Sequence, residues 1–217
     1  MNKLLTLVLA VGLSCSLVGC ASNKEATKSN SNKTQVVQDL TGLNPLYTLP
    51  KTIKLVPSHK EERPALIKAL IDGLDIPKNF AVNTLLYYNT VDLDPNINEE
   101  YFVELLGRYT SGTGGNTGAW IGVENGKYKI LQTFTLLKMP LIISDHKTNG
   151  HRDIINASYG GGKHYLSYDT FVFKDGKYSL DKSKEIKKLD DTIHGSAIFY
   201  NDVEADRENK DVLYLKL

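Results

Sequence analysis

The sequence has 217 residues, with 26 Lys and Arg against 25 Asp and Glu and a formal net charge of +1. Such a balance excludes a basic surface for nucleic acid or for anionic lipid, while the 41% hydrophobic content suffices for a domain with its own core. The two cysteines, Cys15 and Cys20, both lie near the N-terminus. The rest of the chain therefore offers no thiolate for catalysis, zinc or an iron–sulfur cluster, and no disulfide.

Residues 1–19 are predicted to form a signal peptide, because a lysine is followed by an apolar run too short to span a bilayer. The run ends in Leu17-Val18-Gly19-Cys20, which resembles the lipobox of bacterial lipoproteins. This resemblance implies cleavage before Cys20 and lipidation of its side chain, since several acyl chains are needed for stable anchoring. The alternative is an ordinary secretory signal in which Cys20 has no role.

The residues after the cysteine bear on the final location. Ala21 and Ser22 follow Cys20, without the Asp that retains enteric lipoproteins in the inner membrane. The resemblance therefore implies a lipid anchor in the outer membrane, and we expect the periplasmic face. Residues 20–42 are predicted to be the lipidated cysteine and a flexible polar tether, and residues 43–217 a single globular domain.

A helix is predicted next, beginning at a Ser58 cap, tolerating Pro64 early and closing at Gly73 and Pro77. Its apolar positions recur at helical spacing: Leu66, Ile67, Leu70, Ile71 and Leu74. The following segment, AVNTLLYYNTVDL, is strand-like.

A tandem repeat then covers about 91–131 and 144–181. Each copy contains an Asp/Asn loop, a strand, a glycine cluster and a hairpin, in that order. The hairpin turns are Asn125-Gly126 and Asp175-Gly176, dipeptides preferred by type I′ turns because both turn residues need a positive φ. The sequence therefore predicts two similar β units.

The loop pattern resembles the FG-GAP or VCBS-type repeat, which implies a β protein. More closely, the segments VDLDPNINEEYFV, GTGGNTGAWI, TNGHRDI, GGG and FKDGKY resemble a group of proteobacterial envelope proteins without an agreed activity. This chain has Ser111 and Asn116 where those proteins often place cysteines.

The first loop is a candidate calcium site. Its oxygen ligands would be Asp92, Asp94, Asn96, Asn98 through its carbonyl, and Glu100. The sixth position is Ile97, where such a loop prefers glycine. The alternative is an Asx-stabilised turn that leads into a strand. No other cofactor is expected.

The second loop is degenerate. Asp145, Asn149, Gly150 and Asp153 are in place, but the third position is Lys147, whose ammonium would repel a cation. We expect this loop to be free of metal, with Lys147 paired with Asp145 or Asp153.

After the repeat, KSKEIKKLDDT is predicted to be a short charged helix or loop, and GSAIFYNDV and DVLYLKL two closing strands. Two blade-like units are too few for a propeller. We therefore expect an α+β fold, mostly antiparallel β, with two blade-like units carrying degenerate Asp/Asn loops and one or two covering helices near the N-terminus.

No catalytic set emerges. His146, His151 and His164 surround one turn without zinc-ligand spacing, and His194-Gly195-Ser196 lacks a nucleophile elbow. The glycine clusters lack the features of a phosphate loop. A carboxylate pair for glycoside hydrolysis would be drawn from Glu99, Glu100, Glu104 and Asp153.

We therefore expect a non-enzymatic binding or interaction module, held at the membrane by its lipid and open to a periplasmic or secreted protein partner. One alternative is an inhibitor or immunity protein against a lysozyme-like or peptidoglycan-active enzyme. Another is a hydrolase of envelope polysaccharide or peptidoglycan.

Overall fold

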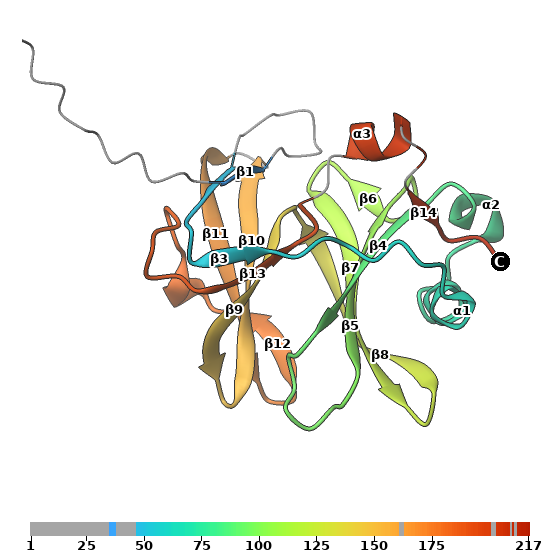
Figure 1. Ribbon diagram of the computed structural model, residues 1–217, viewed down its shortest axis with the longest axis horizontal. Helices are drawn as coiled ribbons and strands as arrows, with labels where there is room; N and C mark the ends of the chain where they lie inside the picture. Colours follow the sequence, from blue (N-terminus) through green and yellow to red (C-terminus); the bar gives the residue numbers. More distant parts are fainter. Residues whose placement is uncertain (1–34, 38–46, 161–162, 201–202, 209, 211) are drawn as a thin grey trace, which may run out of the picture. The chain divides into compact units, whose positions relative to one another are not determined.

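The computed structural model describes residues 35–37, 47–160, 163–200, 203–208, 210 and 212–217 (Figure 1). The predicted signal peptide, Cys20 and most of the predicted tether lie outside these residues. Residues Gln35–Val37, which fall within that tether, form strand β1 and pair with β2 (Tyr47–Leu49). In the part of the chain that the structure describes, no helix is long and apolar enough to cross a membrane.

Two six-stranded sheets form the fold. The first sheet has the order β14-β4-β5-β7-β6, with β8 also paired to β7. Its strands are β4 (Leu85–Val91), β5 (Glu100–Leu106), β6 (Ser111–Gly112), β7 (Gly115–Glu124), β8 (Lys127–Leu137) and β14 (Leu213–Tyr214).

The second sheet has the order β12-β11-β10-β9-β13-β3 and contains one parallel pair, β13 with β3. Its strands are β3 (Ile53–Leu55), β9 (Leu141–Thr148), β10 (His151–Gly160), β11 (Lys163–Lys174), β12 (Lys177–Leu180) and β13 (Gly195–Ile198). Each sheet is built around an antiparallel meander, β4-β5-β7-β8, which we call the first unit, or β9-β10-β11-β12, the second unit. The predicted fold class, mostly antiparallel β, is confirmed.

The two sheets pack face to face through a core of alternating strand residues. Phe102 and Trp120 from the first sheet join Ile154 and Tyr178 from the second in one buried cluster. The rings of Trp120 and Tyr178 meet edge to face, with centroids 5.4 Å apart. We call the faces that meet in this core the inner faces of the sheets.

The outer face of the first sheet is covered by α1 (Pro64–Gly73) and α2 (Lys78–Ala81), as the sequence predicted. The helix begins later than expected, because Pro64 stands at its first turn and Arg63 precedes it. Ser58 is therefore not its cap: its hydroxyl donates to Oδ1 of Asn89 at 3.1 Å.

The outer face of the second sheet is covered by the connection between β12 and β13, which runs through the 3₁₀ helix η1 (Lys182–Lys184). Leu189 of this connection packs with Ile155 and Tyr168 of the sheet. The polar segment between the two closing strands contains a further helix, α3 (Val203–Glu208).

The predicted type I′ hairpins are confirmed by their backbone angles. Asn125 and Gly126 have φ of 51° and 72°, and Asp175 and Gly176 have 53° and 79°. Asn149 and Gly150 adopt the same conformation, with φ of 53° and 85°. The second predicted loop is therefore a tight hairpin between β9 and β10.

Candidate functional site

The first Asp/Asn loop is closed by its own glutamate. The Glu100 side chain is buried and accepts hydrogen bonds from the backbone N–H groups of Leu93 and Asp94, at 2.7 Å and 3.1 Å, and from Nε1 of Trp120 at 2.7 Å. Burial raises the pKa of Glu100 above its ordinary value, and these hydrogen bonds oppose the rise only in part. The carboxylate is thus fully used within the fold.

The turn inside this loop is an Asx turn, which was the alternative to a calcium site. Asp94 accepts from the backbone N–H of Asn96 at 2.8 Å and from its side chain at 2.9 Å. Ile97 does not adopt a positive φ, and its N–H donates to the Asp94 carbonyl at 3.1 Å. Partial burial opposes ionisation of Asp94, but hydrogen bonds from Asn96 and His151 lower its pKa overall.

Two side chains of the β9–β10 hairpin, His151 and Arg152, lie against the first loop. Nε2 of His151 is 3.3 Å from Oδ2 of Asp94, and Nε of Arg152 is 3.7 Å from Oδ2 of Asp92. The His151 ring also stacks on Phe173, with centroids 3.7 Å apart. Two of the acids predicted as calcium ligands, Asp92 and Asp94, therefore contact side chains of the β9–β10 hairpin.

Lys147 was expected to pair with Asp145 or Asp153, but both acids have other partners in the structure. Asp145 instead contacts Nη1 of Arg152 at 2.7 Å, and Asp153 contacts His146 and Lys184. Lys147 stands opposite Arg152 in the strand pairing and is exposed. The cation that balances Asp145 is therefore the neighbouring arginine.

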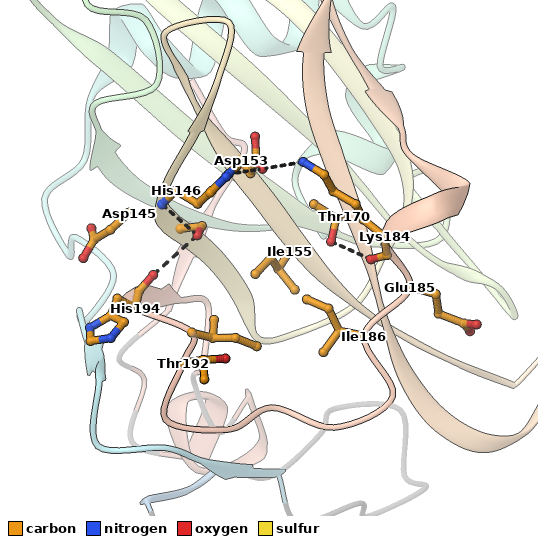
Figure 2. A pocket seen from close by; sticks show the side chains of 12 residues that line it. Asp145, His146, Asp153, Ile155, Thr170, Lys184, Glu185, Ile186, Thr192 and His194 are labelled. Carbon is orange, nitrogen blue, oxygen red and sulfur yellow. Dashed lines mark hydrogen bonds and ion pairs between the residues drawn. The ribbon is translucent and has the colours of Figure 1, made fainter.

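A cavity of about 670 Å³ lies on the outer face of the second sheet (Figure 2). The sheet forms one wall and the connection from η1 to β13 the other. Isoleucines from both walls, Ile155, Ile186 and Ile193, form its apolar part. Its polar residues are Ser144, Asp145, His146, Asp153, Thr170, Lys184, Glu185, Thr192 and His194.

An irregularity in the β9–β10 pairing brings His146 over Asp153. Arg152 pairs with Lys147 and Ile154 with Ile143, so residues 144–146 of β9 stand opposite the single residue 153. Such bulges re-aim side chains and are frequent next to active sites. Here the bulge places an imidazole beside a carboxylate at the cavity wall.

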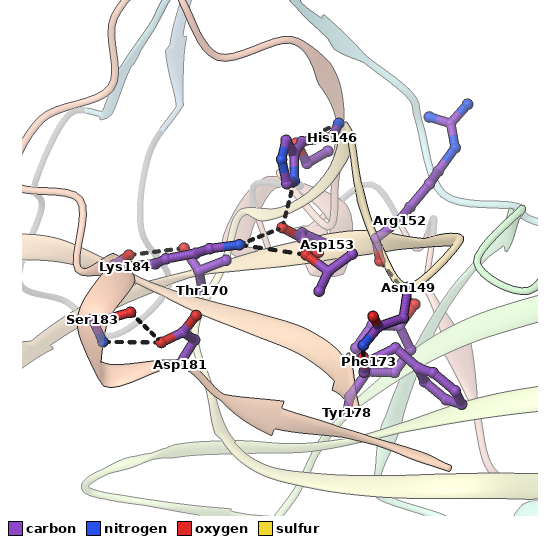
Figure 3. Close-up of polar contacts among 12 residues, drawn as sticks. His146, Asn149, Arg152, Asp153, Thr170, Phe173, Tyr178, Asp181, Ser183 and Lys184 are labelled. Carbon is purple, nitrogen blue, oxygen red and sulfur yellow. Dashed lines mark hydrogen bonds and ion pairs between the residues drawn. The ribbon is translucent and has the colours of Figure 1, made fainter. Parts of the chain in front are cut away.

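His146 and Lys184 converge on Asp153 (Figure 3). Nδ1 of His146 donates to Oδ2 of Asp153 at 2.8 Å, and Nζ of Lys184 lies 3.5 Å from the same oxygen. The ammonium also contacts Oγ1 of Thr148 at 3.4 Å. Asp153 is only 3% exposed, and its Oδ1 has no hydrogen-bond partner among the described residues. Buried carboxylate oxygens are normally paired, so Asp153 has capacity for a further hydrogen bond.

The wall opposite the sheet is fixed by hydrogen bonds. Ile186 exchanges two backbone hydrogen bonds with Tyr168, at 2.7 Å and 2.9 Å. Thr170 donates to the Lys184 carbonyl at 3.0 Å, and Thr52 to the Ile193 carbonyl at 2.6 Å. The cavity is therefore preformed. Burial raises the pKa of Tyr168 to about 12, so its hydroxyl stays neutral at physiological pH.

The other catalytic candidates are not brought together. His194 lines the large cavity, whereas Ser196 lines a separate cavity of about 300 Å³. Glu100 lies in the core between the sheets and Asp153 on the outer face of the second sheet. Glu104 is buried and accepts from Asn116 at 2.8 Å. Of the four acids considered for a hydrolytic pair, only Asp153 lines the cavity of about 670 Å³, and none lines the cavity of about 300 Å³.

Sequence reasoning had noted His146 and Asp153 but not their contact, and it missed Lys184, Thr170 and the isoleucines. Lys184 is 31 positions from Asp153, in a segment predicted only as charged helix or loop. No local pattern could have joined them, because the contact depends on how the connection folds back over the sheet.

Among the residues that the structure describes, no group of three or more His, Cys, Asp or Glu side chains is placed to hold a metal ion. A scan against protein-family models finds no match for this chain. Searches of curated proteins and of solved structures likewise find no match.

Proposed function

We propose that the protein is a lipoprotein of the outer membrane, held through Cys20 at the periplasmic face, and that its domain binds a small ligand without transforming it. The observation that carries the binding proposal is the cavity between the second sheet and the β12–β13 connection. At about 670 Å³ it falls within the range of small-molecule sites. It also combines an apolar part with a few convergent polar groups, as such sites do.

The binding proposal is tested by filling the cavity. In Ile186→Trp a larger ring would occupy it from the connection, whereas Lys187→Trp places the same ring at the next, exposed position. We expect compounds that bind the full chain in lipid nanodiscs, detected by saturation-transfer NMR against a soluble compound library, to be lost in Ile186→Trp and retained in Lys187→Trp. Equal binding by both variants would show that the ligands bind elsewhere.

The anchor is tested separately. Cells that express the full chain are fed an alkyne analogue of palmitate, and labelling is compared with the Cys20→Ser variant. We expect label in the outer-membrane fraction of the wild type alone. If the wild-type protein is unlabelled and released from the membrane, the N-terminus is an ordinary secretory signal and not a lipoprotein signal.

One observation favours a second function, hydrolysis. The buried Asp153 orients His146 through Nδ1, which leaves Nε2 at the cavity as a general base. Turnover of a short-chain ester that is lost in His146→Gln, while binding is kept, would support an enzyme. An equal rate in both proteins would remove this alternative.

A further inference from the structure

At the polar end of the cavity, the hydrogen-bond donors of Lys184 and His146 are not all used by Asp153. Both contacts of the Lys184 ammonium, 3.5 Å to Asp153 and 3.4 Å to Thr148, are long compared with the roughly 2.7–2.9 Å of a strong charge-assisted hydrogen bond. The ammonium is held in position but retains capacity for a closer acceptor. Its side chain is 38% exposed, so that acceptor can approach from the cavity.

His146 adds a second binding group. Since Nδ1 makes the bond to Asp153, Nε2 has no partner among the described residues, and the side chain is 66% exposed. Nε2 can therefore take up a proton without breaking the bond that orients the ring. Nδ1 of His146 and Nζ of Lys184 both lie at Oδ2 of Asp153, so the imidazole and the ammonium are neighbours at the polar end of the cavity.

The charged groups at the polar end of the cavity are paired with one another. Asp153 and Lys184 balance each other, and Asp145 is paired with Arg152 at 2.7 Å. Glu185 adds a further negative charge to the lining, but it is exposed and its carboxylate points away from His146 and Lys184 in Figure 2; the remaining titratable group is His194. A proton on His146 would then be compensated by a negative charge on the ligand.

We propose that the ligand is a small amphiphile with an oxyanion head, a carboxylate or a phosphate monoester, bound by His146 and Lys184. Its apolar body lies on Ile155, Ile186 and Ile193, on the wall beside the head. Proton uptake by His146 accompanies binding. This assignment rests on the proposed binding function and specifies its ligand class.

The test compares ligands that share a tail and differ in the head. Hexanoate, hexyl phosphate, hexylamine and hexanol are titrated calorimetrically into the full chain in lipid nanodiscs, with empty nanodiscs as the blank. We expect the two anions to bind and the amine to be at least about tenfold weaker, as expected for loss of a charge-assisted contact. The ratio of the dissociation constants of hexanoate and hexyl phosphate shows which oxyanion the site prefers.

Two variants locate the head. Lys184→Met keeps the apolar stem and should weaken anion binding at least about tenfold, whereas Lys182→Met, in the same short helix but outside the cavity, should leave it unchanged. His146→Gln should abolish the proton uptake seen by repeating the titration in buffers of different ionisation enthalpy. Unfolding midpoints of all variants check that each is folded.

Two results would overturn the assignment. If hexylamine or hexanol binds as tightly as hexanoate, or if Lys184→Met binds the anions normally, the head group is wrong although the cavity still binds ligands. If none of the four compounds binds and the library screen is also empty, the proposed binding function itself fails.

Discussion

The acids at the ninth position of the two predicted loops, Glu100 and Asp153, have different partners. Glu100 faces the core and is satisfied by backbone N–H groups of its own loop and by Trp120. Asp153 faces the outer side of its sheet, contacts only side chains and leaves Oδ1 without a partner among the described residues. The same chemical group thus closes a turn in one unit and lines a cavity in the other.

The difference extends to the loops around these acids. The hairpin of the second unit supplies His151 and Arg152 to Asp94 and Asp92 of the first loop, so the first loop is held by both units. Asp153 is instead contacted by His146 of its own hairpin and by Lys184 of the connection that follows β12. The first loop is thus part of the contact between the two units, whereas Asp153 lies at the wall of the cavity.

The largest expected effect is on Glu100. Glu100→Ala leaves three donors in a buried position without an acceptor, and should lower the free energy of unfolding by about 3 kcal/mol or more. Urea denaturation of the domain measures it. The exposed neighbour Glu99, with one contact to Tyr101, is the control, and Glu99→Ala should cost under about 1 kcal/mol. Equal losses would contradict the role given to Glu100.

Asp94 should give a smaller effect that depends on pH. Its pKa is lower in the folded state than the ordinary 3.8, so its ionised form stabilises the fold above that value, and this contribution is lost as the pH falls through the folded pKa. Asp94→Asn should therefore cost about 1 kcal/mol at pH 7 and progressively less below pH 4. Unfolding curves across this range measure the difference.

The control for Asp94 is Asp92, whose side chain is 69% exposed and pairs with Arg152 at 3.7 Å. Asp92→Asn should cost less than about 0.5 kcal/mol at pH 7, as for other exposed ion pairs. A loss in Asp94→Asn that stays constant from pH 7 to pH 3 would show that the carboxylate charge plays no part.

Asp153 should behave in the opposite way to Glu100. Its partners Lys184 and His146 are partly exposed and can be solvated when it is neutralised, and the cost of burying its charge disappears. Asp153→Asn should therefore change the free energy of unfolding by less than about 1 kcal/mol. A loss comparable to that of Glu100→Ala would make Asp153 a structural acid as well.

The parts of the fold that could be predicted depend on local chemistry. The strand meanders follow from alternation, and the hairpins from Asn125-Gly126 and Asp175-Gly176, because few other residues tolerate positive φ at both turn positions. The helix was predicted from its apolar stripe, but its start was misplaced because Pro64, not Ser58, fixes the first turn.

The candidate site could be predicted only in fragments. His146 and Asp153 were visible as unusual residues, yet their contact depends on the bulge at residues 144–146, which the apolar pattern of β9 does not show. Lys184 reaches them through a connection with no regular pattern. The predicted pairing of Lys147 with Asp145 or Asp153 was wrong for a related reason. Once the hairpin forms, it is Arg152 that contacts Asp145.

The smallest expected effect concerns calcium at the first loop. With Asp94 and Asp92 held by His151 and Arg152, the melting temperature should agree within about 1 °C between excess calcium and EDTA, because only a bound ion stabilises by mass action. A larger rise of the melting temperature in calcium would restore the predicted site.

The comparison becomes sharper in the double variant His151→Asn, Arg152→Gln, which removes the second unit's side chains that contact the loop. A calcium-dependent rise confined to that variant would mean that the hairpin side chains take the place of an ion that the loop can still bind. No rise in either protein would mean that Ile97 and the closure by Glu100 alone prevent coordination.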